Sequence, residues 1–162
     1  MILSAFTFFH VVISLVGIAS GFVVVYGLLT SKRLDGWTAL FLSTTIATSV
    51  TGFLFPVHHF MASHAVGIVS LIVLTFSVLA RYRFRLEGGW RRTYAVTAVI
   101  ALYLNCFVLI VQLFLKVPAL KELAPTQTEP PFVIAQSAAL LLFTFLGIRA
   151  AMKFHSEPLH SA

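Results

Sequence analysis

Five long apolar runs follow one another along the chain, and short polar connectors separate them. The runs cover residues 2–30, 37–55, 63–82, 92–115 and 131–152. Each is close to or longer than the roughly 20 residues with which a helix crosses a hydrocarbon core. Only helices and closed barrels satisfy their backbone hydrogen bonds in lipid, and no strand pattern is visible. The sequence therefore predicts an all-α integral membrane bundle of five transmembrane helices, forming a single membrane domain over residues 1–162.

The run 37–55 is the least apolar of the five. Six hydroxyl side chains crowd its middle: Ser43, Thr44, Thr45, Thr48, Ser49 and Thr51. Hydroxyls in a membrane helix bond to their own backbone or to a neighbouring helix. A full span is the expectation for this run, and a re-entrant segment is the alternative.

The overall composition supports lipid as the solvent of the chain. Hydrophobic residues make up 59% of the 162 positions and charged residues only 10%. In a soluble domain about a quarter of the residues are charged. The formal net charge of +6 does not indicate nucleic-acid binding, because the basic residues lie in the connectors.

The basic residues alternate from one connector to the next. The first connector contains Lys32 and Arg33, the second (56–62) contains neither Lys nor Arg, and the third has five arginines between positions 81 and 92. Cytoplasmic connectors carry the excess of Lys and Arg in membrane proteins. The pattern predicts an N-terminus outside and a C-terminus in the cytoplasm.

Polar side chains inside the apolar runs gather toward the outer side of this predicted topology. Their depth is counted from the outer end of each run at 1.5 Å per residue. The side chains that lie between the outer boundary and the midplane are His10, His64, Asn105, Gln112, Lys116 and Gln136. Asn105, Gln112 and Lys116 are spaced by seven and four positions, which places them on one helix face. Because polar groups in a membrane cost free energy, this cluster is the candidate site.

The simplest interpretation of the cluster is structural. Asn105, Gln112 and Gln136 would hold helices together by hydrogen bonds worth about 0.5–2 kcal/mol each. The leading functional expectation is then a non-enzymatic accessory protein that binds a cofactor or a partner helix at an outer polar pocket.

A redox interpretation is the first alternative. His10 and His64 would be the axial ligands of a b-type haem, since neutral imidazole suits haem iron. Lys116 would pair with a propionate, and the amides of Asn105, Gln112 and Gln136 would complete the pocket. A quinone in the same place is the second form of this hypothesis.

A metal site is the second alternative. His58, His59 and His64 lie close together in the sequence, and imidazole ligands suit copper or zinc. The short second connector brings no carboxylate, and His10 and Met61 are the further candidate ligands. Imidazole with a thioether would favour copper, and imidazole alone could hold zinc.

Small residues share a face with His10 on the first run. Ser14, Gly17 and Gly21 follow it at spacings of four, three and four, and the two glycines form a GxxxG pair. Such pairs let another helix approach closely. The expected partners are the lipid bilayer, together with a second copy or another membrane protein docked on this face.

Hydrolytic or phosphoryl-transfer chemistry finds no support in the pattern. The acidic residues all lie in connectors or the tail: Asp35, Glu87, Glu122, Glu129 and Glu157. No nucleophile elbow or glycine-rich phosphate loop is visible.

The fourth connector (116–131) is predicted to be ordered, because four prolines restrict its backbone. It is placed to cap the outer cluster, with Glu129 facing Lys116 or a histidine. A passive linker is the alternative.

Four stretches carry a family resemblance: residues 10–21, 48–56, 101–105 and 123–131. On these the chain is similar to a group of small bacterial multi-pass membrane proteins that has no assigned activity. The resemblance extends over nearly the whole chain and implies a location in the bacterial inner membrane. It implies no mechanism and no functional residues.

Overall fold

Helices are the only regular structure in the described part of the chain. The computed structural model describes residues 2–55 and 62–154, with side chains at 4–55 and 64–154. The elements are α1 (Ile2–Leu29), α2 (Asp35–Gly52), α3 (Ala62–Val78), the π-helical turn η1 (Leu79–Arg83), α4 (Trp90–Lys116), α5 (Pro118–Leu123) and α6 (Pro130–Lys153). The all-α fold is confirmed, and the long helices begin and end within a few residues of the apolar runs. The sequence pattern does not predict η1 or the short helix α5.

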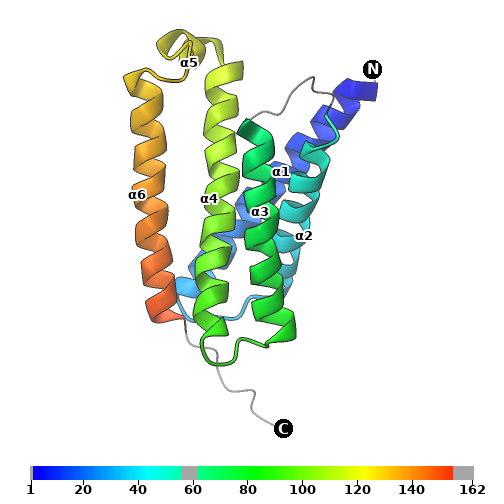
Figure 1. Ribbon diagram of the computed structural model, residues 1–162, viewed down its shortest axis with the longest axis vertical. Helices are drawn as coiled ribbons and strands as arrows, with labels where there is room; N and C mark the ends of the chain where they lie inside the picture. The colour runs from blue at the N-terminus through cyan, green and yellow to red at the C-terminus, as the bar shows by residue number, and fades with distance from the viewer. Residues whose placement is uncertain (1, 56–61, 155–162) are drawn as a thin grey trace.

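The central helix of the bundle is α4. It runs side by side with α6 on one flank and α3 on the other (Figure 1). Three alanines on α4, Ala95, Ala98 and Ala101, have no exposed surface. Small side chains let helix backbones approach closely. The helix that touches the most neighbours thus has several alanines among its buried residues.

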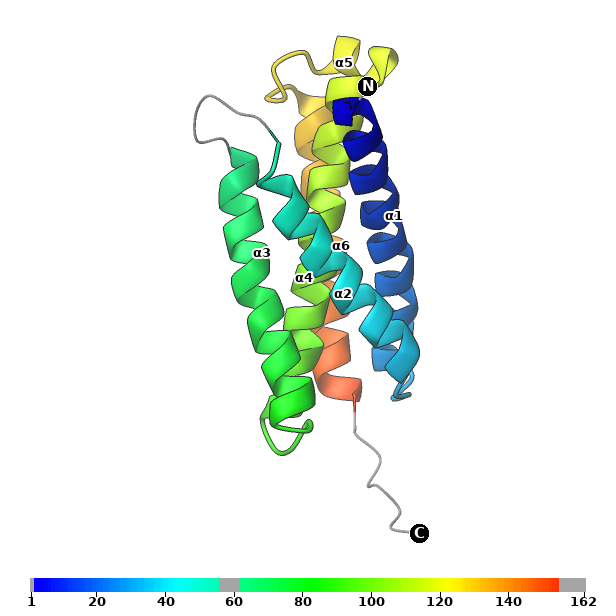
Figure 2. The ribbon, with the colours of Figure 1, turned by 90° about the vertical axis from the view of Figure 1, so that its right-hand side faces the viewer.

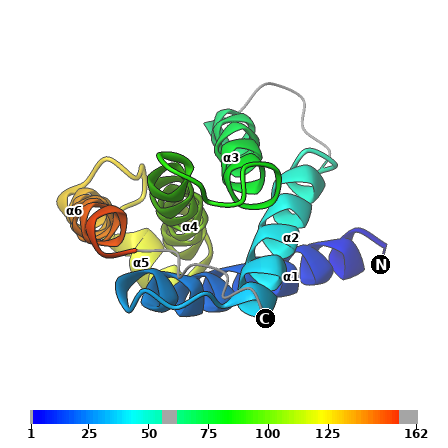
Figure 3. The same cartoon turned by 90° about the horizontal axis from the view of Figure 1, so that it is seen from below.

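The other two long helices lie obliquely across this row. α1 packs along α2 and α4 and also reaches α6, whereas α2 lies between α1 and α3 (Figures 2 and 3). The rings of Phe22 on α1 and Phe143 on α6, with centroids 6.1 Å apart, mark the contact of α1 with α6.

Within residues 2–55 and 62–154, four helices are long and apolar enough to cross a membrane. They are Ser4–Leu29, His64–Arg83, Trp90–Lys116 and Pro130–Lys153. α2 does not meet this criterion, because its hydroxyls and Asp35 lower its hydropathy. The structure thus supports a membrane protein with four candidate spans, one fewer than the sequence pattern predicts.

Large apolar side chains cover the outer face of α6. Ile134, Leu141, Phe145 and Met152 are between 58% and 71% exposed. A continuous apolar face of this kind is unfavourable in water and is satisfied by lipid.

The polar side chains of α2 point at its neighbours. They form hydrogen bonds with α1 (His10–Thr51, 2.8 Å; Ser14–Thr48, 3.4 Å), with α3 (Ser49–Ser70, 3.1 Å) and with α4 (Thr38–Tyr94, 3.1 Å; Thr45–Asn105, 3.2 Å). The hydroxyl groups that make α2 the least apolar helix therefore join it to three other helices.

Gly17 and Gly21 lie where α1 crosses α2 and α4. A Cβ atom on Gly21 would lie 2.6 Å from Leu102 and 2.9 Å from Phe41, and one on Gly17 would lie 3.2 Å from Thr44. Both glycines are buried. The predicted close helix approach is therefore present, and it is made within the chain.

Substitution of Gly21 by Ala is expected to destabilise the bundle. Leu102 and Phe41 are 0% and 1% exposed, so neither side chain has room to move away from the new methyl group. Overpacking of this kind costs about 1–3 kcal/mol. Circular dichroism in detergent should show a lower midpoint of thermal unfolding.

Gly36→Ala is the matched control, because a Cβ atom there meets nothing within 4 Å. It should leave the midpoint unchanged or raise it slightly, since alanine favours helix. Equal midpoints for the two variants would contradict tight packing at Gly21.

Candidate functional site

His10 lies on α1 beside the C-terminal end of α2. Its Nδ1 atom is 2.8 Å from the Thr51 hydroxyl, and its ring meets Phe55 edge-on at 5.1 Å. The hydroxyl of Ser14, one turn further on, donates to the His10 carbonyl and thereby supports this part of the helix. His10 thus points into the bundle, with its ring orientation fixed by two residues of the second apolar run.

His64 lies on the opposite side of α2. Its ring contacts that of Phe53, with centroids 5.7 Å apart, and α2 separates α1 from α3 (Figure 2). His10 and His64 thus contact different side chains at the end of α2.

The predicted metal site falls only partly within the structure. His58 and His59 lie outside the described residues. Within residues 2–55 and 62–154, no group of three His, Cys, Asp or Glu side chains is placed to hold a metal ion. His64 is the one member of the predicted set whose surroundings are described.

The polar face of α4 is covered at one level and open at another. Asn105 Nδ2 donates to Thr45 Oγ1 at 3.2 Å, whereas Gln112 and Lys116 are exposed. Further down the same face, Tyr94 and Leu102 are buried against α2 and α1. A Cβ atom on Gly17 of α1 would lie 3.6 Å from the Asn105 side chain. Toward its N-terminus α1 diverges from α4 (Figure 1).

Gln136 is half-buried between α6 and α4. Its Nε2 atom donates to the Phe107 carbonyl at 3.2 Å. Its Oε1 atom is also buried, and it accepts no hydrogen bond in the described part of the chain. The amide therefore joins the two helices, as interhelical hydrogen bonding predicts, with one acceptor unused.

The connector between α5 and α6 is folded on itself. The Glu129 carboxylate accepts hydrogen bonds from the Thr126 hydroxyl (2.8 Å) and from the backbone N–H of Thr128 (3.1 Å). Gln127 Nε2 donates to the Val111 carbonyl of α4 at 3.0 Å. The hydrogen bond from the Thr126 hydroxyl, followed by those from backbone N–H groups such as that of Thr128, holds the pKa of Glu129 below its usual value. Glu129 thus orders its own loop, and within the described residues it pairs with neither Lys116 nor a histidine.

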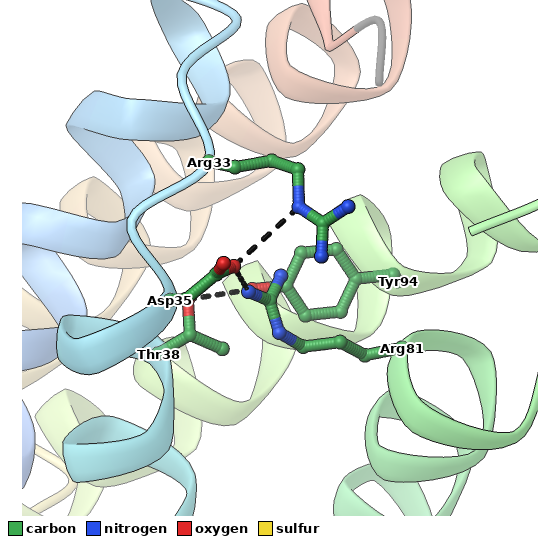
Figure 4. Close-up of polar contacts among 5 residues, drawn as sticks. All are labelled: Arg33, Asp35, Thr38, Arg81 and Tyr94. Carbon is green, nitrogen blue, oxygen red and sulfur yellow. Dashed lines mark hydrogen bonds and ion pairs between the residues drawn. The ribbon is translucent and has the colours of Figure 1, made fainter. Parts of the chain in front are cut away.

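A second polar cluster occupies the opposite end of the bundle, and the sequence pattern does not predict it. Its members are Arg33, Asp35, Thr38, Arg81 and Tyr94 (Figure 4). Arg81 Nη2 donates to Asp35 Oδ1, and Arg33 Nε lies 3.4 Å from the same oxygen. The Arg81 guanidinium lies 5.2 Å from the centre of the Tyr94 ring, whose hydroxyl bonds to Thr38 at 3.1 Å.

The two charged partners differ greatly in exposure. The side chain of Arg81 is 3% exposed, whereas that of Asp35 is 66% exposed. A buried cation is tolerated only when it is paired, and an aromatic face adds to that pairing. Asp35 and Tyr94 therefore hold a charge that the apolar surroundings would otherwise disfavour.

Arg81 reaches this position from η1. The backbone N–H of Phe84 bonds to the carbonyl of Leu79, five residues back, as in a π-helix. The sequence pattern assigns Arg81 to an arginine-rich connector. A signal in the sequence does indicate burial: Ser70, Leu74, Ser77 and Arg81 are spaced by four, three and four, and all four are buried.

Comparison of the chain with protein-family models, curated proteins and solved structures gave no match. The family resemblance therefore stays an expectation from the four sequence stretches.

Removal of Asp35 is expected to destabilise the protein more than removal of Arg81. Asp35→Ala leaves a buried guanidinium without its carboxylate, and such a group costs about 1–3 kcal/mol or more. Arg81→Met leaves behind a carboxylate that is mostly exposed and still near Arg33. Thermal unfolding in detergent should give the lower midpoint for Asp35→Ala.

Glu87→Ala is the control for loss of an acidic side chain in an exposed position. It should leave the midpoint unchanged. A larger loss for Arg81→Met than for Asp35→Ala would show that Arg81 acts by filling space and not as a paired charge.

Proposed function

We propose that the chain is a five-span protein of the bacterial inner membrane, with its N-terminus outside and its C-terminus in the cytoplasm. α2 is the additional span. Its hydroxyls are bonded to α1, α3 and α4, and Thr44 returns its hydrogen bond to the Leu40 carbonyl at 2.7 Å. Because these groups are satisfied, low hydropathy does not keep α2 out of the membrane.

The charge distribution supports this orientation. Lys32 and Arg33 come directly after α1, and Lys153 ends α6. Further arginines lie in η1 and in the turn after it. These segments share one end of the bundle (Figure 1). Lys and Arg accumulate on the cytoplasmic side.

The proposed activity is that of an accessory protein that binds another membrane protein, and it has no catalytic step. The observation that carries it is the open part of the α4 face. Gln112 and Lys116 are exposed on a face that is otherwise buried against α1 and α2. In a membrane, exposed polar groups are costly and gain from a partner.

The partner chemistry follows from the two side chains. An amide favours a hydrogen-bonding side chain on a facing helix, and an ammonium group favours a carboxylate about one turn closer to the boundary. The expected occupant is thus a transmembrane helix of another protein that carries Asp or Glu near its outer end. Gly17 and Gly21 are already packed inside the chain, so docking uses the α4 face in place of the predicted GxxxG face.

Photo-crosslinking at the α4 face tests this proposal. A photoreactive residue at Leu113, which is 40% exposed beside Gln112, should give a discrete protein adduct in native membranes. Gln112→Leu and Lys116→Gln should each reduce its yield several-fold. Sequencing of the crosslinked peptide should identify a transmembrane helix with an acidic residue at its outer end.

The same probe at Leu141 on the outer face of α6 is the control and should label lipid only. Lipid labelling alone at Leu113, or a yield that does not depend on Gln112 and Lys116, would overturn the proposal. An adduct with a second copy of the chain would show that the α4 face binds another copy and not a different protein.

A redox or metal-binding role is the second candidate, and the orientation of His10 favours it. The Thr51 hydroxyl holds Nδ1, which leaves Nε2 as the ligating atom, the arrangement commonly found at metal-bound histidines. In this alternative His10 and His64 hold b-type haem or quinone, and His58, His59 and His64 hold copper or zinc.

Purified protein from cells supplied with haem precursors and metals tests this alternative. Haem binding predicts a Soret band that His10→Ala and His64→Ala abolish. Quinone and metal binding predict a stoichiometric amount of each in the extracted protein. A colourless preparation without quinone or metal would remove the cofactor hypotheses and leave partner binding.

A further inference from the structure

A recess opens beside the buried arginine at the end of the bundle opposite to α5. It is lined by apolar residues of α1 and the segment after α6, by Thr38 and Tyr94, and by three cations: Lys32, Arg33 and Arg81. Lys32 and Arg33 lie at its mouth, where both residues are accessible to solvent.

The charges at this mouth do not cancel. Lys32, Arg33 and Arg81 supply three positive charges, and Asp35 supplies the single negative charge paired with them. The surplus is two positive charges. An anion is the chemical complement of this arrangement.

The backbone that carries the two exposed cations is held in place before any ligand arrives, and the Arg33 side chain is also paired. Arg33 Nε is 3.4 Å from Asp35, which leaves the terminal nitrogens of the guanidinium for a second partner. The Ser31 hydroxyl donates to the Lys153 carbonyl at 3.1 Å, and Lys32 N–H bonds to the Gly27 carbonyl at 2.8 Å. These bonds tie the connector to both α1 and the end of α6, so little conformational entropy remains to be lost.

The depth of the site in the membrane narrows the choice of anion. Tyr26 and Trp37, close to the connector on either side, are 58% and 48% exposed. Exposed Tyr and Trp rings settle at the level of the lipid head groups. The anion that is abundant at this level is the phosphate of an acidic phospholipid.

We infer that Lys32 and Arg33, the second oriented by Asp35, bind the head-group phosphate of an anionic phospholipid in the cytoplasmic leaflet. Arg33 engages the phosphate through its planar fork and Lys32 through a single ammonium. Asp35 is the opposing charge in this site: it orients Arg33 and also repels the ligand. This site lies at the opposite end from the α4 docking face, and neither proposal depends on the other.

Lipid-dependent thermal unfolding of the full chain in detergent tests the inference. Added phosphatidylglycerol should raise the unfolding midpoint, and phosphatidylcholine should not. The double variant Lys32→Gln, Arg33→Gln should need about 30-fold more phosphatidylglycerol for the same shift, from about 1 kcal/mol per basic residue. Arg81 keeps Asp35 paired in this variant, and the lipid-induced shift is measured from the variant's own midpoint without lipid.

The matched control removes two other exposed cations at the same end. Arg83→Gln, Arg92→Gln lowers the net charge equally and should leave the lipid dependence unchanged within about threefold. Inorganic phosphate at the same concentration should give no shift.

Three results would overturn the inference. The first is an equal loss of lipid response in both double variants, which would indicate unspecific attraction to the basic end. The second is an undiminished response in Lys32→Gln, Arg33→Gln. The third is an equal shift with inorganic phosphate, which would assign the site to a soluble anion.

Discussion

A buried polar side chain is stable only where another group bonds to it, and among the helices that the structure describes this constraint acts most strongly on α2. Its hydroxyls have partners on α1, α3 and α4, from Thr38 near one end to Thr51 near the other. These bonds are directional, unlike the packing of apolar side chains. They therefore fix how α2 is rotated and where it lies along its neighbours. The oblique crossing of α1, and with it the open face of α4, follows from that placement.

The two ends of the bundle satisfy their polar groups differently. At the end near α5, a carboxylate orders its own loop, amides join neighbouring helices, and Gln112 and Lys116 remain exposed. At the other end, one carboxylate lies between two arginines, and an aromatic ring covers the buried one. The first end thus exposes an amide and an ammonium group, whereas the second has a surplus of positive charge.

The apolar runs were sufficient to predict the helices, because the length of a span and the demand for internal backbone bonding allow few alternatives. The face shared by Asn105, Gln112 and Lys116 also follows from spacing. Spacing does not show which part of that face is covered, since this depends on where α1 departs from α4. Spacing likewise does not show that Gly17 packs against helices of its own chain, since this also depends on where α1 crosses α2 and α4. Arg81 was assigned to a connector because charge usually marks the end of a span, although its spacing from Ser77 and Leu74 indicates the buried face.

The π-helical turn in η1 contains one residue more than an α-helical path between the same points would need. In terms of chain length, the segment that carries the buried arginine therefore contains an insertion. Deletion of Leu79 would let the helix continue with α geometry and would turn Arg81 by about 100° about the helix axis. The guanidinium would then leave Asp35 and Tyr94. A homologous chain one residue shorter at this point would thus be expected to carry an uncharged residue in place of Arg81, together with a different connection between α3 and α4.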